Sequence, residues 1–96
     1  MSDKVEYLFE LIRSGDWING TEVAGMFDKD VNEWAHSDYT REYAAEMMAT
    51  MDNPEPLTDD WEGYVLIHPK LAIMFSIWCS TEFHIRYNDI AFTSIK

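Results

Sequence analysis

The strongest constraint on the fold is one nearly continuous apolar stretch, residues 63–78, which reads GYVLIHPKLAIMFSIW. Residues 64–67 have the length and composition of a short buried strand. His68-Pro69 ends this extended run, because a residue before proline avoids the α region and proline suits the first position of a helix. Helical spacing then connects the next apolar residues, Leu71, Met74, Phe75 and Trp78. The sequence therefore predicts a strand that leads directly into an apolar helix at the centre of the core.

The rest of the chain predicts a single, mainly helical α+β domain spanning residues 1–96. Helical spacing or capping signals mark residues 3–14, 21–27, 31–36, 41–51 and the segment after residue 80. Residues 17–18 are predicted to be extended, and residues 52–63 to form a loop, because two prolines and five acids disfavour a regular element there. We expect five or six short helices with a two- or three-stranded sheet, and one core containing Trp34, Leu71, Phe75, Trp78 and Phe83.

Three residues are predicted to cap helices with their side chains: Thr21, Thr40 and Ser80. His68 is expected to accept a backbone N–H at a helix start. Within residues 41–51, Tyr43, Met48 and neighbouring apolar side chains are predicted to face the core, because their spacing is that of a buried helix face.

The net charge of −11 is distributed unevenly. Residues 1–62 carry 16 acidic and 4 basic side chains, whereas residues 63–96 carry 2 acidic and 3 basic side chains. Binding to a phosphate backbone requires clustered Lys and Arg, so direct binding to nucleic acid is not expected.

The sequence contains no recognisable catalytic or metal-binding pattern. The three histidines and the single cysteine, Cys79, do not have the spacing of a zinc site, and Cys79 lacks a neighbouring base. We therefore expect neither an enzyme nor a cofactor. One cysteine, no apolar run long enough for a membrane span and no leader pattern predict a protein of a reducing cytoplasm with no membrane contact.

Several short motifs follow one another along the chain, beginning with Asn19-Gly20-Thr21, residues 29–34 (KDVNEW) and Thr40. These motifs resemble the first half of the KilA-N domain, in which an Asn-Ala-Thr turn, a basic segment with a Trp, and a Thr follow in order. The second half is matched by Tyr64, His68-Pro69, Leu71-Ala72, Trp78 and Phe83. The resemblance covers about residues 16–92. It implies a DNA-binding type of scaffold, found in phages and large DNA viruses and related to APSES domains.

The acidic residues depart from the family pattern where basic residues are usual. Asp30 stands beside Lys29 in the segment where the family has Lys-Arg, and Glu22 follows the turn. The residues that we expect to bind a partner are the acids of this region: Asp28, Asp30, Glu33, Asp38, Glu42 and Glu46.

Three interpretations remain open at the level of sequence. In the first, the acidic face imitates DNA and blocks the basic groove of a host nucleic-acid-binding protein, for example a CRISPR effector or a restriction enzyme. In the second, a phage regulatory protein binds DNA through the less acidic last third, with Lys70, Arg86 and Lys96. In the third, the domain is a structural module that forms homo-oligomers through an apolar patch.

Overall fold

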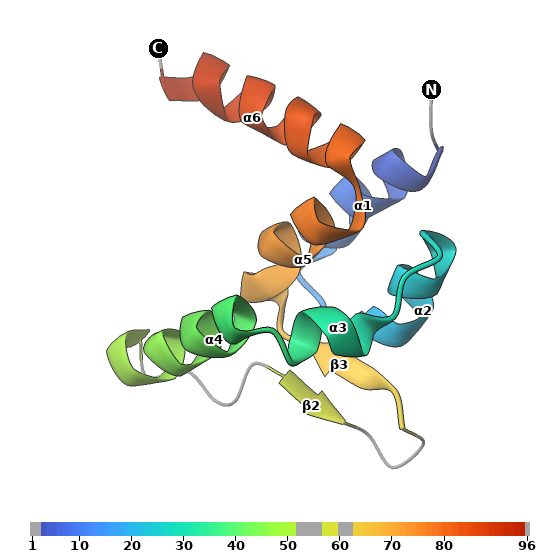
Figure 1. Ribbon diagram of the computed structural model, residues 1–96. Helices are drawn as coiled ribbons and strands as arrows, with labels where there is room; N and C mark the ends of the chain where they lie inside the picture. The colour runs from blue at the N-terminus through green and yellow to red at the C-terminus, as the bar shows by residue number, and fades with distance from the viewer. Residues whose placement is uncertain (1–2, 52–56, 60–62, 96) are drawn as a thin grey trace.

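The computed structural model describes residues 3–51, 57–59 and 63–95, and this part of the chain contains six α-helices, one 3-10 helix and a small sheet (Figure 1). In chain order the elements are α1 (Asp3–Ser14), β1 (Ile18–Asn19), α2 (Gly20–Met26), α3 (Val31–Ala35), α4 (Asp38–Met51), β2 (Leu57–Asp59), β3 (Val65–Ile67), η1 (Pro69–Leu71), α5 (Ala72–Cys79) and α6 (Thr81–Ile95). The prediction of a mainly helical domain with a minor sheet is confirmed.

The sheet is antiparallel, and β3 lies between β1 and β2. Ile67 of β3 is paired with Ile18 on one side and with Leu57 on the other. The prediction that residues 52–63 form only a loop is wrong at β2, because both prolines precede this strand and its three residues keep their N–H groups. The remainder of that predicted loop, apart from Gly63, lies outside the described residues.

The strand and helix of the apolar stretch occupy the centre of the core, as predicted. Leu71, Phe75 and Phe83 are fully buried, and the exposed fraction of Trp34 is 3%. The ring centroids of Trp34 and Phe75 lie 5.1 Å apart in an edge-to-face arrangement. Trp78 is half-buried and packs 6.4 Å from the Trp34 ring. All five aromatic and aliphatic side chains expected in one core therefore meet there.

Helices α1, α5 and α6 pack together on the side of the core away from the sheet (Figure 1). The Phe9 ring of α1 lies 4.6 Å from the Phe83 ring of α6. Beyond this contact α6 extends past the other helices (Figure 1). Ile90, which is seven residues after the buried Phe83 and so lies on the same side of α6, is 52% exposed.

Two of the predicted caps are confirmed. His68 Nδ1 accepts a hydrogen bond from the Lys70 N–H at 3.0 Å, at the start of η1. Ser80 Oγ accepts a hydrogen bond from the Phe83 N–H at 3.1 Å, at the start of α6. These two interactions fix the direction of the chain where it enters and leaves the central helix.

The other two predicted caps are wrong, because a better-placed polar residue precedes each of them. Asn19 caps α2 by accepting the Glu22 N–H, and Thr21 instead accepts the Val65 N–H at 2.9 Å, which joins α2 to β3. Ser37 caps α4 by accepting the Thr40 N–H, which leaves Thr40 fully buried within the first turn.

Helix α4 contacts the core through a narrower stripe than the sequence predicts. Thr40, Ala44 and Met47 are buried on this stripe. Tyr43 and Met48, which were expected to face the core, are each 43% exposed. In Figure 1, α4 lies at one end of the molecule, beside α3, and away from α1 and α6. An outward-facing aromatic surface results.

Candidate partner-binding surface

All six acidic residues predicted to bind a partner are exposed. They lie on three consecutive segments, which are the α2–α3 connection, α3 and α4. In Figure 1 these segments run across the molecule, from the α2–α3 connection on the right to α4 on the left. The acids are thus spread along one course of the chain and are not gathered at one point.

Two of the six acids have local structural roles. Asp30 is the N-cap of α3, and its Oδ1 accepts a hydrogen bond from the Asn32 N–H at 2.9 Å. Asp28 adopts a left-handed backbone conformation with φ of 58°, which Asp tolerates better than most residues. The local fold therefore constrains both positions, independently of any partner.

The other four acids carry charges that no described basic residue balances within ion-pair distance. Among the described residues the only ion pairs are Arg13–Glu10 and Arg86–Glu82. Asp38 lies in the first turn of α4, where the helix dipole favours a negative charge. Glu33 is exposed on α3, and Glu42 and Glu46 are exposed one turn apart on α4. These carboxylates are free to interact with an external cation.

Glu42 and Glu46 also line a shallow groove on α4, together with Tyr39 and Tyr43. The groove has a volume of about 300 Å³. The two tyrosine ring centroids lie 6.4 Å apart, with their planes inclined at 50°. Neither tyrosine is among the site residues predicted from the sequence, although the i, i+3, i+4, i+7 spacing of these four residues marks one helix face.

A comparison with protein-family models identifies the scaffold. The KilA-N domain matches residues 5–93, so the similarity begins within α1 and includes nearly the whole chain. The chain belongs to the KilA-N family. No curated protein and no solved structure shows a significant match to it.

The basic residue of this KilA-N domain's Lys29–Trp34 segment is bound within the protein. Lys29 Nζ donates a hydrogen bond to the backbone oxygen of Trp78 at 2.9 Å and lies 5.0 Å from the centroid of the Trp78 ring. Trp78 is in the last turn of α5, where unpaired carbonyl groups favour a cation. Lys29 therefore caps α5 and stacks on an indole.

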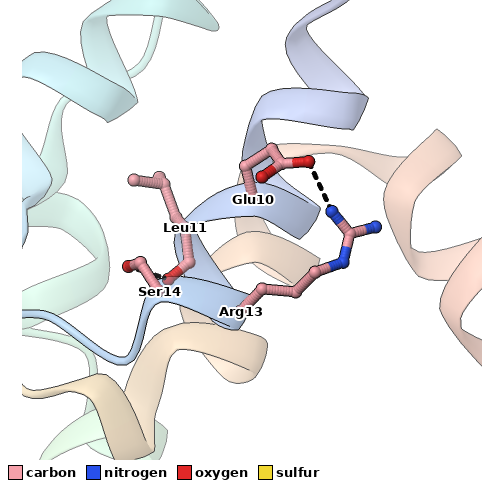
Figure 2. A network of polar contacts seen from close by, with 4 residues as sticks. All are labelled: Glu10, Leu11, Arg13 and Ser14. Atoms are coloured by element: carbon pink, nitrogen blue, oxygen red, sulfur yellow. Dashed lines mark hydrogen bonds and ion pairs between the residues drawn. The ribbon is translucent and has the colours of Figure 1, made fainter.

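Three other basic side chains, those of Lys4, Arg13 and Arg86, also have partners within the domain. Figure 2 shows Arg13 paired with the Glu10 carboxylate at the end of α1. The Arg86 guanidinium lies 6.0 Å from the Phe9 ring and 3.9 Å from Glu82, and Lys4 Nζ lies 5.8 Å from the Phe27 ring. Within the part of the chain that the structure describes, Arg41 and Lys70 alone lack such a side-chain contact.

These positions bear on the second interpretation, in which Lys70, Arg86 and Lys96 contact DNA. Lys70 is exposed, whereas Arg86 is partly buried beside Phe9, and Lys96 lies outside the described residues. Strong DNA-binding proteins make about 6–10 phosphate contacts. The described residues of this KilA-N domain present no comparable group of unpaired basic side chains.

Cys79 is buried at the end of α5, with an exposed fraction of 3%. Burial raises the pKa of the Cys79 thiol to about 12, against the opposing attraction of Lys29. The thiol is therefore neutral at physiological pH. The described residues contain no group of three or more His, Cys, Asp or Glu side chains that fits a metal ion. None of the described helices has the length and apolar character needed to cross a bilayer.

Proposed function

We propose that this KilA-N domain binds a basic, nucleic-acid-binding surface of another protein and thereby excludes the nucleic acid. The observation that carries the proposal is the contrast between the two kinds of charge. Glu33, Asp38, Glu42 and Glu46 are exposed and form no ion pair with any described residue, whereas Lys29 is bound to Trp78. Unpaired, exposed carboxylates of this kind attract a basic surface and repel phosphate.

The candidate partners are proteins of a bacterial host that hold nucleic acid in a basic groove, such as a CRISPR effector or a restriction enzyme. The occurrence of KilA-N domains in phages favours a target in host defence. Electrostatic attraction would accelerate the encounter and would make binding sensitive to salt.

The proposal is tested by a matched pair of charge-reversal variants. The first replaces Glu33, Glu42 and Glu46 with Lys; the second replaces Glu6, Asp16 and Asp89 with Lys, at exposed positions away from α3 and α4. Both variants change the net charge by the same amount. Asp30 is left unchanged because it caps α3. Urea unfolding of both variants verifies that the fold is retained.

Each protein is immobilised and exposed to a lysate of a bacterial host, and retained proteins are quantified. We expect a nucleic-acid-binding protein that wild type and the second variant retain, that the first variant loses, and that added duplex DNA displaces. Equal retention of every captured protein by all three domains would contradict binding through α3 and α4.

A second candidate function, binding of DNA by a phage regulatory protein, is favoured by the match of the KilA-N family over residues 5–93. Among the described residues, Lys70 and Arg41 are the exposed basic side chains that make no ion pair, hydrogen bond or ring contact through their charged groups. This function predicts salt-dependent retention of duplex DNA, weakened by replacing these two residues with Ala.

A further inference from the structure

The groove on α4, defined by Tyr39, Glu42, Tyr43 and Glu46, combines exposed aromatic rings with carboxylates. Its aromatic side chains are strongly exposed, at 68% for Tyr39 and 43% for Tyr43. Its two carboxylates lie one helical turn apart on the same face. Aromatic faces and carboxylates both attract cations, the former through the negative face of the ring.

The electrostatics of the groove are unfavourable in the isolated domain. Like charges at i and i+4 repel each other on a helix, and neither carboxylate has a basic partner among the described residues. Arg41 is adjacent to Glu42 in sequence and so projects from a different side of α4, because successive helical residues are about 100° apart. A cation placed between Glu42 and Glu46 would relieve this repulsion.

We propose that this groove binds the guanidinium group of an arginine side chain in a basic partner. Arginine fits better than lysine for geometrical reasons. Its planar guanidinium can lie against a tyrosine ring while its N–H groups, which point outward in the same plane, donate to carboxylates beside the ring. The lysine ammonium is a compact, strongly hydrated point charge and gains less from a flat aromatic face.

This inference rests on the proposed function and makes it more specific. Glu42 and Glu46 supply the charge that selects a basic surface, and Tyr39 and Tyr43 select arginine within that surface. In this arrangement α4 contributes the anchor of the interface, and Glu33 and Asp38 contribute longer-range attraction.

The test uses three synthetic peptides of equal length, Ac-GRGRGRG-NH2 and its analogues with lysine or with neutral citrulline in place of arginine. Binding is followed by NMR titration of the wild-type domain. We expect the arginine peptide to bind most tightly, the lysine peptide more weakly and the citrulline peptide not measurably. The tyrosine ring signals of Tyr39 and Tyr43 should shift with the arginine peptide.

A double variant, Tyr39→Ala with Tyr43→Ala, should weaken binding of the arginine peptide about fivefold and remove its preference over lysine. Both tyrosines are largely exposed, so the fold should be retained, and Tyr7→Ala is the control because Tyr7 is 41% exposed on α1. A second comparison uses two double variants. One carries Glu42→Gln and Glu46→Gln on α4, and the control carries Glu6→Gln and Asp89→Asn. We expect only the α4 pair to abolish binding.

The outcomes separate the groove from the wider proposal. The arginine groove would be overturned if the arginine and lysine peptides bound equally and the tyrosine variant left their binding unchanged. If the α4 glutamine variant still abolished that binding, the role of the acidic residues in the proposed function would stand. Binding that both glutamine pairs weaken equally would overturn the groove as well. Absence of binding by either charged peptide at low salt would overturn both the groove and the acidic face.

Discussion

Lys29 Nζ donates a hydrogen bond to the backbone oxygen of Trp78, a residue 49 positions later in the chain. This contact ties the α2–α3 connection to the end of α5 and places a cation at a helix C-terminus. It also engages, within the fold, a charge that the resemblance would assign to a DNA-binding segment, while the Lys29 side chain stays exposed. The same side chain therefore stabilises the end of α5.

Replacing Lys29 with Met should lower the free energy of unfolding by about 1 kcal/mol, because the Trp78 carbonyl loses a charged donor. Lys70→Met is the matched control, since Lys70 is exposed and makes no side-chain contact within the described residues; it should change stability by less than about 0.5 kcal/mol. Urea unfolding followed by tryptophan fluorescence measures both. Equal stability of the two variants would show that the Lys29–Trp78 contact contributes nothing.

The cap of α3 gives a second prediction. Asp30→Ala should lower the free energy of unfolding by about 1 kcal/mol. Asp30→Asn should lower it much less, because an amide oxygen also accepts the Asn32 N–H. Thermal or urea unfolding of both variants distinguishes a cap from a simple charge effect. If Asn destabilises as much as Ala, the role of Asp30 is electrostatic and the cap assignment is wrong.

The parts of the fold that the sequence predicts are those determined by neighbouring residues. His68 and Ser80 cap their helices as expected because Pro69 and the change of hydrophobic pattern fix where those helices begin. Asn19 and Thr21 illustrate the limit of such reasoning, since both are good capping residues two positions apart. Thr21 is not the cap, because its hydroxyl instead accepts the backbone N–H of Val65, a residue 44 positions later.

The candidate site shows the same limit. The exposed positions of the six acids follow from their charge, and all are exposed. The groove does not follow, because Tyr43 and Met48 have the spacing of a buried face, and only the end position of α4 leaves them exposed. Likewise, the strand β2 depends on pairing with β3, which outweighs the local preference for a loop.

Gly20 at the start of α2 gives a third prediction. A Cβ atom there would lie 2.5 Å from Ile67 Cδ1 and 3.1 Å from Val31 Cγ2. Gly20→Ala should therefore destabilise the domain by about 1–3 kcal/mol through overpacking. Ile67→Val removes the Cδ1 methyl, so the double variant should be more stable than the sum of the two single effects.

Gly25→Ala is the control for this cycle, because a Cβ there meets nothing within 4 Å. It lies inside α2 and should stabilise the domain by about 0.5–1 kcal/mol. Denaturant titrations of the four cycle members and this control provide the comparison. Strict additivity of Gly20→Ala and Ile67→Val would mean that the close approach is relieved elsewhere.

The buried thiol of Cys79 gives a prediction of pH dependence. Its folded pKa of about 12 exceeds the ordinary value of 9.0, so the folded state retains the proton after the unfolded state begins to lose it. The stability contributed by the protonated thiol is present below about pH 9 and decreases as the pH rises toward 12. The stability difference between wild type and Cys79→Ala should therefore shrink from pH 8 to pH 11. A constant difference would show that the thiol titrates normally.

The most direct test of the account is a titration of fluorescently labelled duplex DNA with the purified domain, followed by anisotropy at physiological salt. We predict no binding tighter than about 100 µM, because the exposed acids of α3 and α4 repel phosphate and Lys29 is held by Trp78. Sub-micromolar binding that weakens steeply with added salt would contradict the account and would establish this KilA-N domain as a DNA-binding protein.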